Sequence, residues 1–321
     1  MLRLLLAVLF GCLPVLAQLS SAVPCPIQRA AAKGENVWLL CDRQGVYVSP
    51  DEGKTWKARR APTEAKLRAV AVLDARRGFV AGDGGTLLAT SDAGATWEPV
   101  AVPVKDNLTS IYFVGDHGWI AGWTGAILHS KDGGKTWERQ SSGILHALDD
   151  IFFADEKHGW AVGWAGTILR TTDGGATWEQ VRVPNVMWSM SAVYFTDLNN
   201  GWITGFNGQI LRSRDGGRTW EPVSSPVQSW LTSVVFDRSG RGWIAAENGL
   251  LTTEDGGSSW KILPVEGTVF LHQVLTSKEA LWAVGNWGVL RQRPGERTLT
   301  PVTNLPAAAG GSRASGVDAT D

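Results

Sequence analysis

The 321-residue sequence has almost no net charge, because 30 Lys and Arg residues stand against 31 Asp and Glu residues. It lacks the clustered basic charge of nucleic-acid-binding domains, so nucleic acid is excluded as a partner. Hydrophobic residues make up 44% of the chain and charged residues 19%, which excludes a mainly disordered protein. The five histidines do not cluster and no metal-ligand spacing is visible, so we expect neither a metal nor another cofactor.

Long hydrophobic runs are also missing, since no segment has the 18 or more apolar residues of a transmembrane helix. Residues 1–17 have the pattern of an export signal, with Arg3, an apolar stretch over 4–15 and a small-residue cleavage site at Ala17. A second cleavage site follows Ala22. We therefore expect an exported protein, located in the periplasm or, in a photosynthetic source, the thylakoid lumen, either free or at the membrane periphery. Lipid attachment at Cys12 is an alternative, because residues 9–12 loosely resemble a lipoprotein box.

Cysteine is scarce, and cleavage of the signal leaves only Cys25 and Cys41, sixteen residues apart. An exported protein reaches a compartment that permits disulfides. A bridge that ties the N-terminal segment to the first folded unit is one possibility, and two unpaired thiols are the other.

Glycine and tryptophan are abundant instead, with 38 and 17 residues against only three tyrosines. An octapeptide repeat of the form Ser/Thr-x-Asp-x-Gly-x-Thr/Ser-Trp explains much of this excess. Its six aspartates lie 40 to 42 residues apart: Asp51, Asp92, Asp132, Asp173, Asp215 and Asp255. Repeats of this period are typical of propellers and other repeat architectures.

Two further motifs precede each octapeptide: an apolar run such as 108–113, and a Gly-Trp-x-x-Gly segment such as 118–122. With a stretch after the octapeptide, each unit has four short strand-like runs and no room for a long helix. The sequence therefore predicts an all-β, seven-bladed β-propeller over 24–305, with octapeptide turns in six blades, followed by a disordered tail over 306–321. The seventh unit carries Pro294, Glu296 and Leu299 where the others have Asp, Gly and Trp. The first unit shows no clear leading strand, so we expect the two chain ends to share a blade.

The octapeptide is expected to be structural. Its Asp can accept hydrogen bonds from the amides of a tight turn, and its Gly supplies a positive φ. Six copies around a ring point to separate places and cannot converge on one substrate.

These octapeptides resemble the Asp-boxes, or bacterial neuraminidase repeats, of sialidases, sortilin-type receptors and xyloglucanases. The full unit, an apolar run followed by Gly-Trp-x-x-Gly-x-x-Gly-x-Ile-Leu and the Asp-box, resembles the photosystem II stability and assembly factor family over residues 36–299. That resemblance implies a non-enzymatic propeller in the thylakoid lumen or periplasm that binds newly made membrane-protein subunits during complex assembly. It implies a protein client and does not identify it.

A glycoside hydrolase, sialidase-like or glucanase-like, is the alternative function. The sialidase type uses a tyrosine nucleophile, but Tyr47, Tyr112 and Tyr194 all lie inside repeat strands. Asp149 and Asp150 are adjacent, so strand alternation predicts that they point to opposite faces and cannot act as a facing pair.

Subtracting the repeat leaves five tryptophans outside the two repeated positions. Trp123 and Trp164 occupy the turn between the second and third strands, Phe206 fills the same place in the fifth unit, and Trp287 lies one residue beyond it in the seventh. Trp188, Trp230 and Phe270 come just before first strands. In an up-and-down blade these turns and links open on one face, where surplus aromatics are typical of a protein-binding site. The alternative is that they cap the channel and pack on each other.

Basic residues give a second candidate site. Arg170 and Arg212, with His129 and Arg291, share the position just before the Ser or Thr of the octapeptide or its degenerate equivalent. The family resemblance implies that a basic patch contributes to client binding. The position lies inside a strand, however, and an ion pair between neighbouring blades is the role that we favour.

Overall fold

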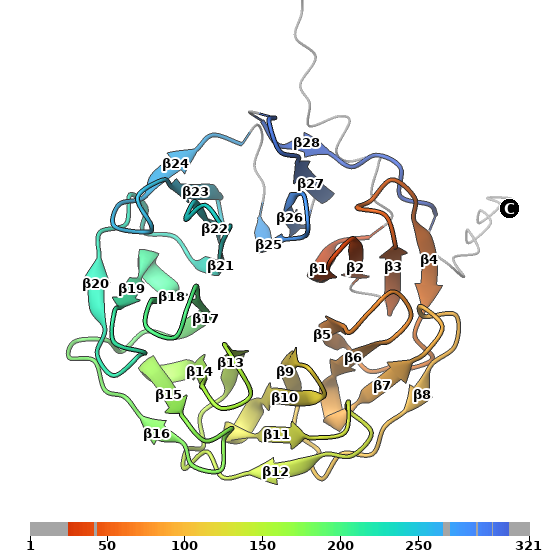
Figure 1. Cartoon of the computed structure of the whole chain (residues 1–321), viewed down its shortest axis with the longest axis horizontal. Coiled ribbons are helices and arrows are strands. Elements are labelled where there is room, and N and C mark those ends of the chain that lie inside the picture. Colours follow the sequence, from red (N-terminus) through yellow and green to blue (C-terminus); the bar gives the residue numbers. More distant parts are fainter. Residues whose placement is uncertain (1–24, 42–43, 266–269, 287, 297, 308–321) are drawn as a thin grey trace, which may run out of the picture.

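The structure, a computed structural model, describes residues 25–41, 44–265, 270–286, 288–296 and 298–307. These residues form seven four-stranded sheets, each joined in simple up-and-down order, and the sheets stand as blades around a central channel (Figure 1). The predicted all-β, seven-bladed propeller is confirmed. Over the same residues, no helix is both long enough and apolar enough to cross a membrane.

The first strand of each blade lines the channel and the second lies directly outside it (Figure 1). The first strands are β1 (Ile27–Lys33), β5 (Leu67–Val72), β9 (Leu108–Val114), β13 (Leu148–Phe153), β17 (Met190–Phe195), β21 (Leu231–Phe236) and β25 (Leu271–Thr276). The second strands are β2 (Asn36–Cys41), β6 (Gly78–Gly82), β10 (His117–Gly122), β14 (Gly159–Gly163), β18 (Gly201–Gly205), β22 (Gly242–Ala246) and β26 (Leu281–Gly285).

The third and fourth strands complete each blade toward the rim. The third strands are β3 (Gly45–Ser49), β7 (Leu87–Thr90), β11 (Ile127–Ser130), β15 (Thr167–Thr171), β19 (Ile210–Ser213), β23 (Gly249–Thr253) and β27 (Gly288–Gln292). The fourth strands are β4 (Lys57–Arg60), β8 (Glu98–Pro99), β12 (Glu138–Gln140), β16 (Glu179–Gln180), β20 (Glu221–Val223), β24 (Lys261–Leu263) and β28 (Thr300–Pro301). In blades 2 to 5 a short 3-10 turn follows the second strand: η1 (Asp83–Gly85), η2 (Trp123–Gly125), η3 (Trp164–Gly166) and η4 (Phe206–Gly208).

Hydrophobic cores lie between adjacent blades, because both faces of each sheet are covered by its neighbours. The second strand β14 is buried over its whole length for this reason. Trp160 of β14 stacks on Phe195 of the next blade with ring centroids 3.5 Å apart, and Trp220 meets the same phenylalanine edge-on at 5.7 Å. Large aromatic groups at the repeated positions therefore hold neighbouring blades together.

The expectation that the chain ends share a blade is wrong. Strand β1 is a complete first strand from the N-terminal side, so blade 1 contains β1 to β4 and blade 7 contains β25 to β28. The sequence did not predict β1, because its residues, Ile-Gln-Arg-Ala-Ala-Ala-Lys, are mainly alanine and charged residues. The ring closes by side-chain contacts instead: Gln273 Oε1 accepts from the Ala30 amide at 2.8 Å, and Trp56 packs edge-on to Trp282 at 6.1 Å.

The octapeptide turns between third and fourth strands share one hydrogen-bond pattern. In blade 3, Asp132 accepts from the Thr136 amide at 2.9 Å, the Thr136 hydroxyl at 2.6 Å and the Ser130 hydroxyl at 2.8 Å. The Ser130 hydroxyl oxygen in turn accepts from the Gly134 amide at 2.9 Å. The other five octapeptides make the same bonds. These carboxylates are thus occupied in closing turns.

Candidate functional site

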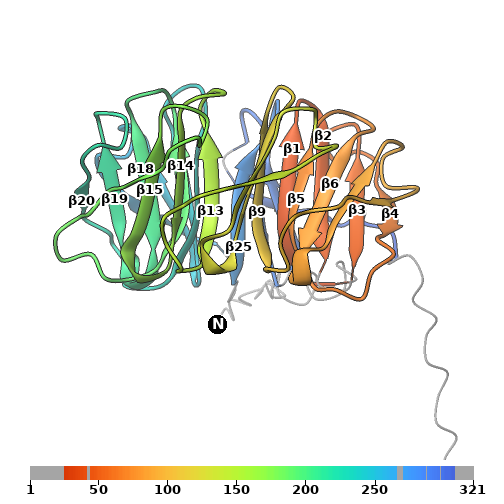
Figure 2. The same cartoon turned by 90° about the horizontal axis from the view of Figure 1, so that it is seen from below.

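The two flat faces of the ring are built from different connections, and Figure 2 shows the strands running between them. The turns after the second strands and the links between blades hydrogen-bond to each other: the Gly166 amide donates to Trp188 O at 3.1 Å, and Gly208 to Ser229 O at 2.8 Å. We call the side that they form the link face. The octapeptide turns, together with the turns between first and second strands, form the opposite box face.

Large apolar side chains are exposed on the link face of blades 3 to 5. Their exposed fractions are 42% for Trp123, 85% for Leu145, 56% for Trp164, 81% for Met187, 55% for Trp188 and 40% for Phe206. We call these six residues the aromatic surface. Exposed aromatic and methionine side chains grouped on one face are typical of interaction sites.

Backbone geometry explains why these side chains are held outward. Trp123, Trp164 and Phe206 each begin a 3-10 turn whose next two residues have positive φ, as at Thr124 (54°) and Gly125 (68°). The turn is fixed from below, because the Trp123 amide donates to Asn107 O at 2.9 Å and the Trp164 amide to Ala147 O at 2.9 Å. In blade 2 the same position holds Asp83, so the aromatic series begins at blade 3.

Two aromatics that the repeat subtraction selected are largely covered. Trp230 stacks on Phe206 at 4.6 Å and meets Phe270 edge-on at 5.9 Å, and its indole N–H donates to Ser191 Oγ at 2.6 Å. Trp230 and Phe270 therefore pack on each other at the rim of the channel. Trp287 lies outside the described residues.

Leu145 and Met187 were missed by sequence reasoning, which considered only aromatic residues. Both lie in links between blades, where the repeat has no consensus against which a surplus residue stands out. Met187 does carry a usable signal, because it directly precedes Trp188 in the sequence.

A charged edge borders the aromatic surface on the side of blade 2. The Arg68 guanidinium lies over the Trp123 ring, 5.4 Å from its centroid, and also pairs with the Asp83 carboxylate. Cation–π contact and ion pair together restrain the Trp123 side chain. A ligand on the aromatic surface would meet this positive group at its margin.

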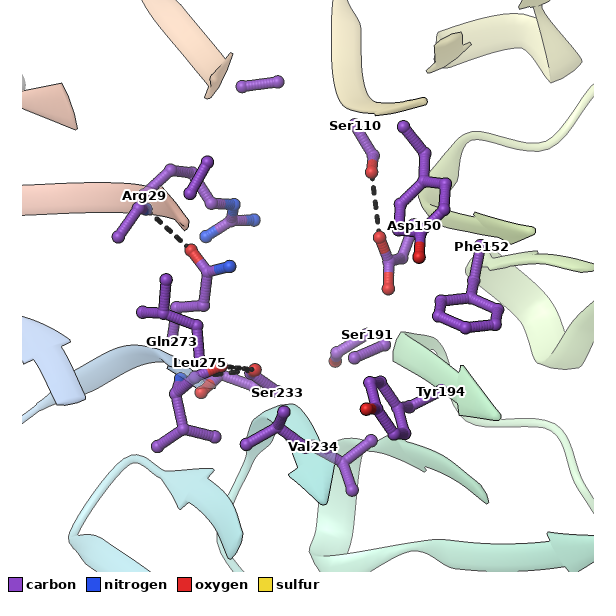
Figure 3. Close-up of a pocket in the computed structure, with 18 of the residues that line it drawn as sticks. Arg29, Ser110, Asp150, Phe152, Ser191, Tyr194, Ser233, Val234, Gln273 and Leu275 are labelled. Atoms are coloured by element: carbon purple, nitrogen blue, oxygen red, sulfur yellow. Dashed lines mark hydrogen bonds between the residues drawn. The ribbon is translucent and has the colours of Figure 1, made fainter. Parts of the chain in front are cut away.

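The central channel has a volume of about 380 Å³ and is lined by all seven first strands. Figure 3 shows Arg29 of β1 and Asp150 of β13 pointing into it from opposite sides. Asp149 borders this space as well, and the strict alternation on which the expectation of opposite faces rested does not hold here. The pairing of β13 with β14 shifts between Leu148 and Asp150, and the resulting β-bulge breaks the alternation of side chains.

Burial dominates the protonation of this acidic pair. It raises the pKa of Asp149 to about 7, against the opposing attraction of Arg29. It also raises the pKa of Asp150. Asp150 accepts hydrogen bonds from the Ser110 hydroxyl at 2.8 Å and the Val193 amide at 3.0 Å, and thereby links the inner strands of blades 3, 4 and 5.

Arg170 and Arg212 reach across to the next blade near the box face. Arg170 Nε donates to Gly216 O at 2.7 Å, and Arg212 Nη1 donates to Ser258 Oγ at 2.6 Å. A contact between blades was predicted for these arginines, but as an ion pair, which differs from the bonds in the structure. These bonds end on a carbonyl and a hydroxyl, whereas the ion pair of Arg170, with Glu179 at 3.7 Å, lies within blade 4.

Cys25 and Cys41 form a disulfide in the structure, with Cα atoms 5.9 Å apart. The bridge lies where β1 begins its pairing with β2, because Cys41 pairs with Ile27, two residues after Cys25. Among the described residues, no three His, Cys, Asp or Glu side chains are arranged to hold a metal ion.

The fold is a seven-bladed β-propeller with octapeptide turns in six blades, and large apolar side chains are exposed on one of its faces. The family of the photosynthesis system II assembly factor YCF48 matches residues 51–146, 140–187 and 180–270. Because these matches span most of the chain, the protein belongs to the YCF48 assembly factor family.

Solved structures share the fold. One described as YCF48 bound to D1 peptide has a TM-score of 0.71 and 19% identity, covering 86% of this chain and 94% of its own. YCF48 from Cyanidioschyzon merolae has a TM-score of 0.70 and 18% identity, covering 86% and 99%. The GH74 enzyme of Niastella koreensis, with a TM-score of 0.65 and 17% identity, matches 88% of this chain but 53% of its own. Among curated proteins, none matches this sequence.

Proposed function

We propose that this protein is an exported, non-enzymatic assembly factor that binds a polypeptide segment of a membrane-protein subunit on its aromatic surface. The observation that carries the proposal is the exposure of Trp123, Trp164 and Trp188 on a single face. Membership of the YCF48 family supports an assembly role, and one related structure is described as bound to a D1 peptide. The D1 subunit of photosystem II is therefore the first client to test.

An apolar client segment suits this surface. Burying a large side chain of this kind contributes about 1.5–3 kcal/mol, and three ordered tryptophans offer rigid contact area. Arg68 at the margin, already paired with Asp83, can donate a remaining N–H to a carbonyl of the same segment. We assign Trp230 and Phe270 to packing of the channel rim, and Arg170 and Arg212 to contacts between blades.

The test is binding of a fluorescent D1 peptide, measured by anisotropy. We expect the Trp123→Ala/Trp164→Ala variant to bind at least about tenfold more weakly, a loss of about 1.4 kcal/mol, with unchanged thermal stability. The matched control is Leu198→Ala/Ile262→Ala, which removes two exposed apolar side chains away from the aromatic surface and should bind normally. Equal binding by both variants would refute the proposed surface.

Capture from solubilised native membranes extends the test beyond D1. Wild-type protein and the two variants are compared as baits, with bound proteins identified by mass spectrometry. We expect one membrane subunit to be enriched by wild type and control and lost with the double tryptophan variant. A failure of wild type to enrich any membrane subunit would contradict the assembly role.

Glycoside hydrolysis remains the second candidate, and the acidic pair at the channel favours it. Asp149 is partly accessible, and its raised pKa is suited to a general acid. Asp150, however, is already engaged by Ser110 and Val193, and Tyr112 and Tyr194 pack around Phe152 at 5.0 and 5.4 Å. Fluorogenic sialosides and glucans test this candidate, and turnover that Asp149→Asn abolishes would establish it.

A further inference from the structure

The contact between blades 6 and 7 differs from the other six. In each octapeptide the glycine at the fifth position presses on a side chain of the preceding blade. A Cβ added there would come within 3.2 Å or less of that side chain. The six contacts are Gly53 on Trp282, Gly94 on Arg59, Gly134 on Phe79, Gly175 on Gln140, Gly217 on Trp160 and Gly257 on Trp202. Glycine is favoured there, because all six have a positive φ of 73° to 88° and four have an aromatic ring where a Cβ would lie.

Blade 7 has Glu296 at this fifth position. The alignment is set by the strands, since Thr252 pairs with Trp243 in blade 6 and Arg291 pairs with Trp282 in blade 7. A glutamate side chain cannot fit against Trp243 as the glycines fit against their partners, and the space between this turn and blade 6 is open, because residues of both line one pocket.

The result is a groove of about 710 Å³ on the box face, between blades 6, 7 and 1. Trp243 lies along it, with the Arg241 guanidinium 5.5 Å from the Trp243 ring centroid. Five cationic residues line the groove (Lys33, Arg238, Arg241, Lys278 and Arg293) against three acidic ones (Asp237, Glu279 and Glu296). Arg241 pairs with Asp237 at 2.8 Å and Lys278 with Glu35 at 2.7 Å. Among the described residues, Lys33, Arg238 and Arg293 have no carboxylate within ion-pair distance.

The filled contacts show what such a surface accepts. Gly174 O takes a hydrogen bond from Trp119 Nε1 at 3.0 Å, and Gly216 O takes one from Trp160 Nε1 at 3.1 Å. Arg170 adds a second bond to Gly216 O. In both cases a glycine turn beside an aspartate covers an indole ring, and at Gly216 it also binds the Arg170 guanidinium.

We propose that this groove, which we call the open junction, docks an acidic, glycine-containing segment of a partner polypeptide. The segment takes the place of the missing octapeptide turn: its glycine backbone lies against the small part of Trp243 that faces the groove, since the ring is 6% exposed, and its carboxylates pair with Arg238 and Arg293. The open junction lies on the box face and the aromatic surface on the link face, so both can be occupied at once. It therefore does not depend on the function proposed above.

The first experiment uses an N-acetylated fluorescent peptide with the sequence of residues 253–260, Thr-Glu-Asp-Gly-Gly-Ser-Ser-Trp. We expect saturable binding to the full chain and at least a tenfold loss in Arg238→Glu/Arg293→Glu. A peptide with lysine at both acidic positions should not compete. Binding should persist in Trp123→Ala/Trp164→Ala, which separates this site from the aromatic surface. Equal binding of the lysine peptide, or no binding of the acidic one, overturns the proposal.

The second experiment closes the groove. Gln292→Thr, Pro294→Asp, Glu296→Gly and Leu299→Trp together restore the octapeptide pattern in blade 7, since Thr298 is already in place. We expect this variant to lose peptide binding while its melting temperature rises, so that unfolding cannot explain the loss. Retained binding, or loss of binding with a lower melting temperature, overturns the proposal.

The protein's own C-terminal segment is the competing occupant. A chain ending at residue 307 tests it, and we expect that chain to bind the peptide as the full chain does. If only the shortened chain binds, the occupant is the segment over 308–321, and the proposal of a partner is wrong.

Discussion

Trp160 and Trp164 lie four residues apart in blade 4 but belong to different regions of the molecule. Trp160, in strand β14, is 1% exposed, stacks on Phe195 and donates its N–H to the next blade. Trp164 begins the following turn and is 56% exposed. The position of Trp160 recurs around the ring and holds blades together, whereas Trp164 is not part of the repeated pattern. Residues that obey the repeat therefore explain the fold, and residues that depart from it are the candidates for binding.

The largest expected effect is on stability, in a direct comparison of these two residues. Trp160→Ala should lower the free energy of unfolding by about 3–5 kcal/mol, because it leaves a cavity between blades. Trp164→Ala should change it by no more than about 0.5 kcal/mol, as for other surface positions. Denaturant titrations of both variants measure the difference. Similar losses would mean that Trp164 also belongs to the core.

Strand β1 at the N-terminus is a core element that carries no repeat motif, and the disulfide beside it provides the next test of stability. Cys25→Ser/Cys41→Ser should cost about 3 kcal/mol, the loop-closure value for a loop of roughly 15 residues, and should leave peptide binding intact. Melting curves with and without reductant measure the loss. Mass spectrometry of the unreduced mature protein provides the check, because two alkylatable thiols would contradict the bridge.

A smaller effect is expected at the octapeptide turns. Hydrogen bonds from Thr136 and Ser130 hold the pKa of Asp132 below its ordinary value, because they stabilise the ionised carboxylate in the folded state. Its stabilisation is complete well above the unfolded pKa near 3.8 and is lost as pH falls from there through the lower pKa of the folded state. Asp132→Ala should therefore lower the melting temperature most at pH 7 and by less at pH 3, where the wild type has already lost part of this stabilisation. Asp106→Ala, on the link face, is the control. If it lowers the melting temperature at pH 7 as much as Asp132→Ala does, the octapeptide aspartate is no more stabilising than an aspartate of the link face.

The last expected effect is in the channel and depends on pH. The pKa of Asp149 is raised to about 7 by burial, so between about pH 4 and 7 the folded state holds a proton that the unfolded state has released. Stability falls as pH rises through this window. Asp149→Asn removes the fall, and the variant should gain stability relative to wild type at pH 8 more than at pH 5. An equal difference in stability between variant and wild type at the two pH values would contradict this, and so would a gain in stability at pH 5 alone.

Periodicity made most of the architecture predictable. Six aspartates 40 to 42 residues apart and seven Gly-rich strands specify blades, because each four-stranded unit can bury its apolar faces only against a copy of itself. Trp123, Trp164 and Trp188 were also found from sequence, since they remain when the repeat is subtracted. Strand β1 was not found, because alanines beside the channel give no apolar periodicity.

Local register and surface geometry were decided by the tertiary structure. Asp149 and Asp150 both border the channel where β13 carries a bulge, which alternation alone does not reveal. Leu145 and Met187 join the aromatic surface because links between blades converge with the turns, and Trp230 leaves it because Phe206 and Phe270 cover it. The sequence by itself determined the number of blades and the residues that bind them together, since those contacts recur at every repeat. Which surplus residues are exposed, and that the contact between blades 6 and 7 is open, depend on packing between segments far apart in the chain.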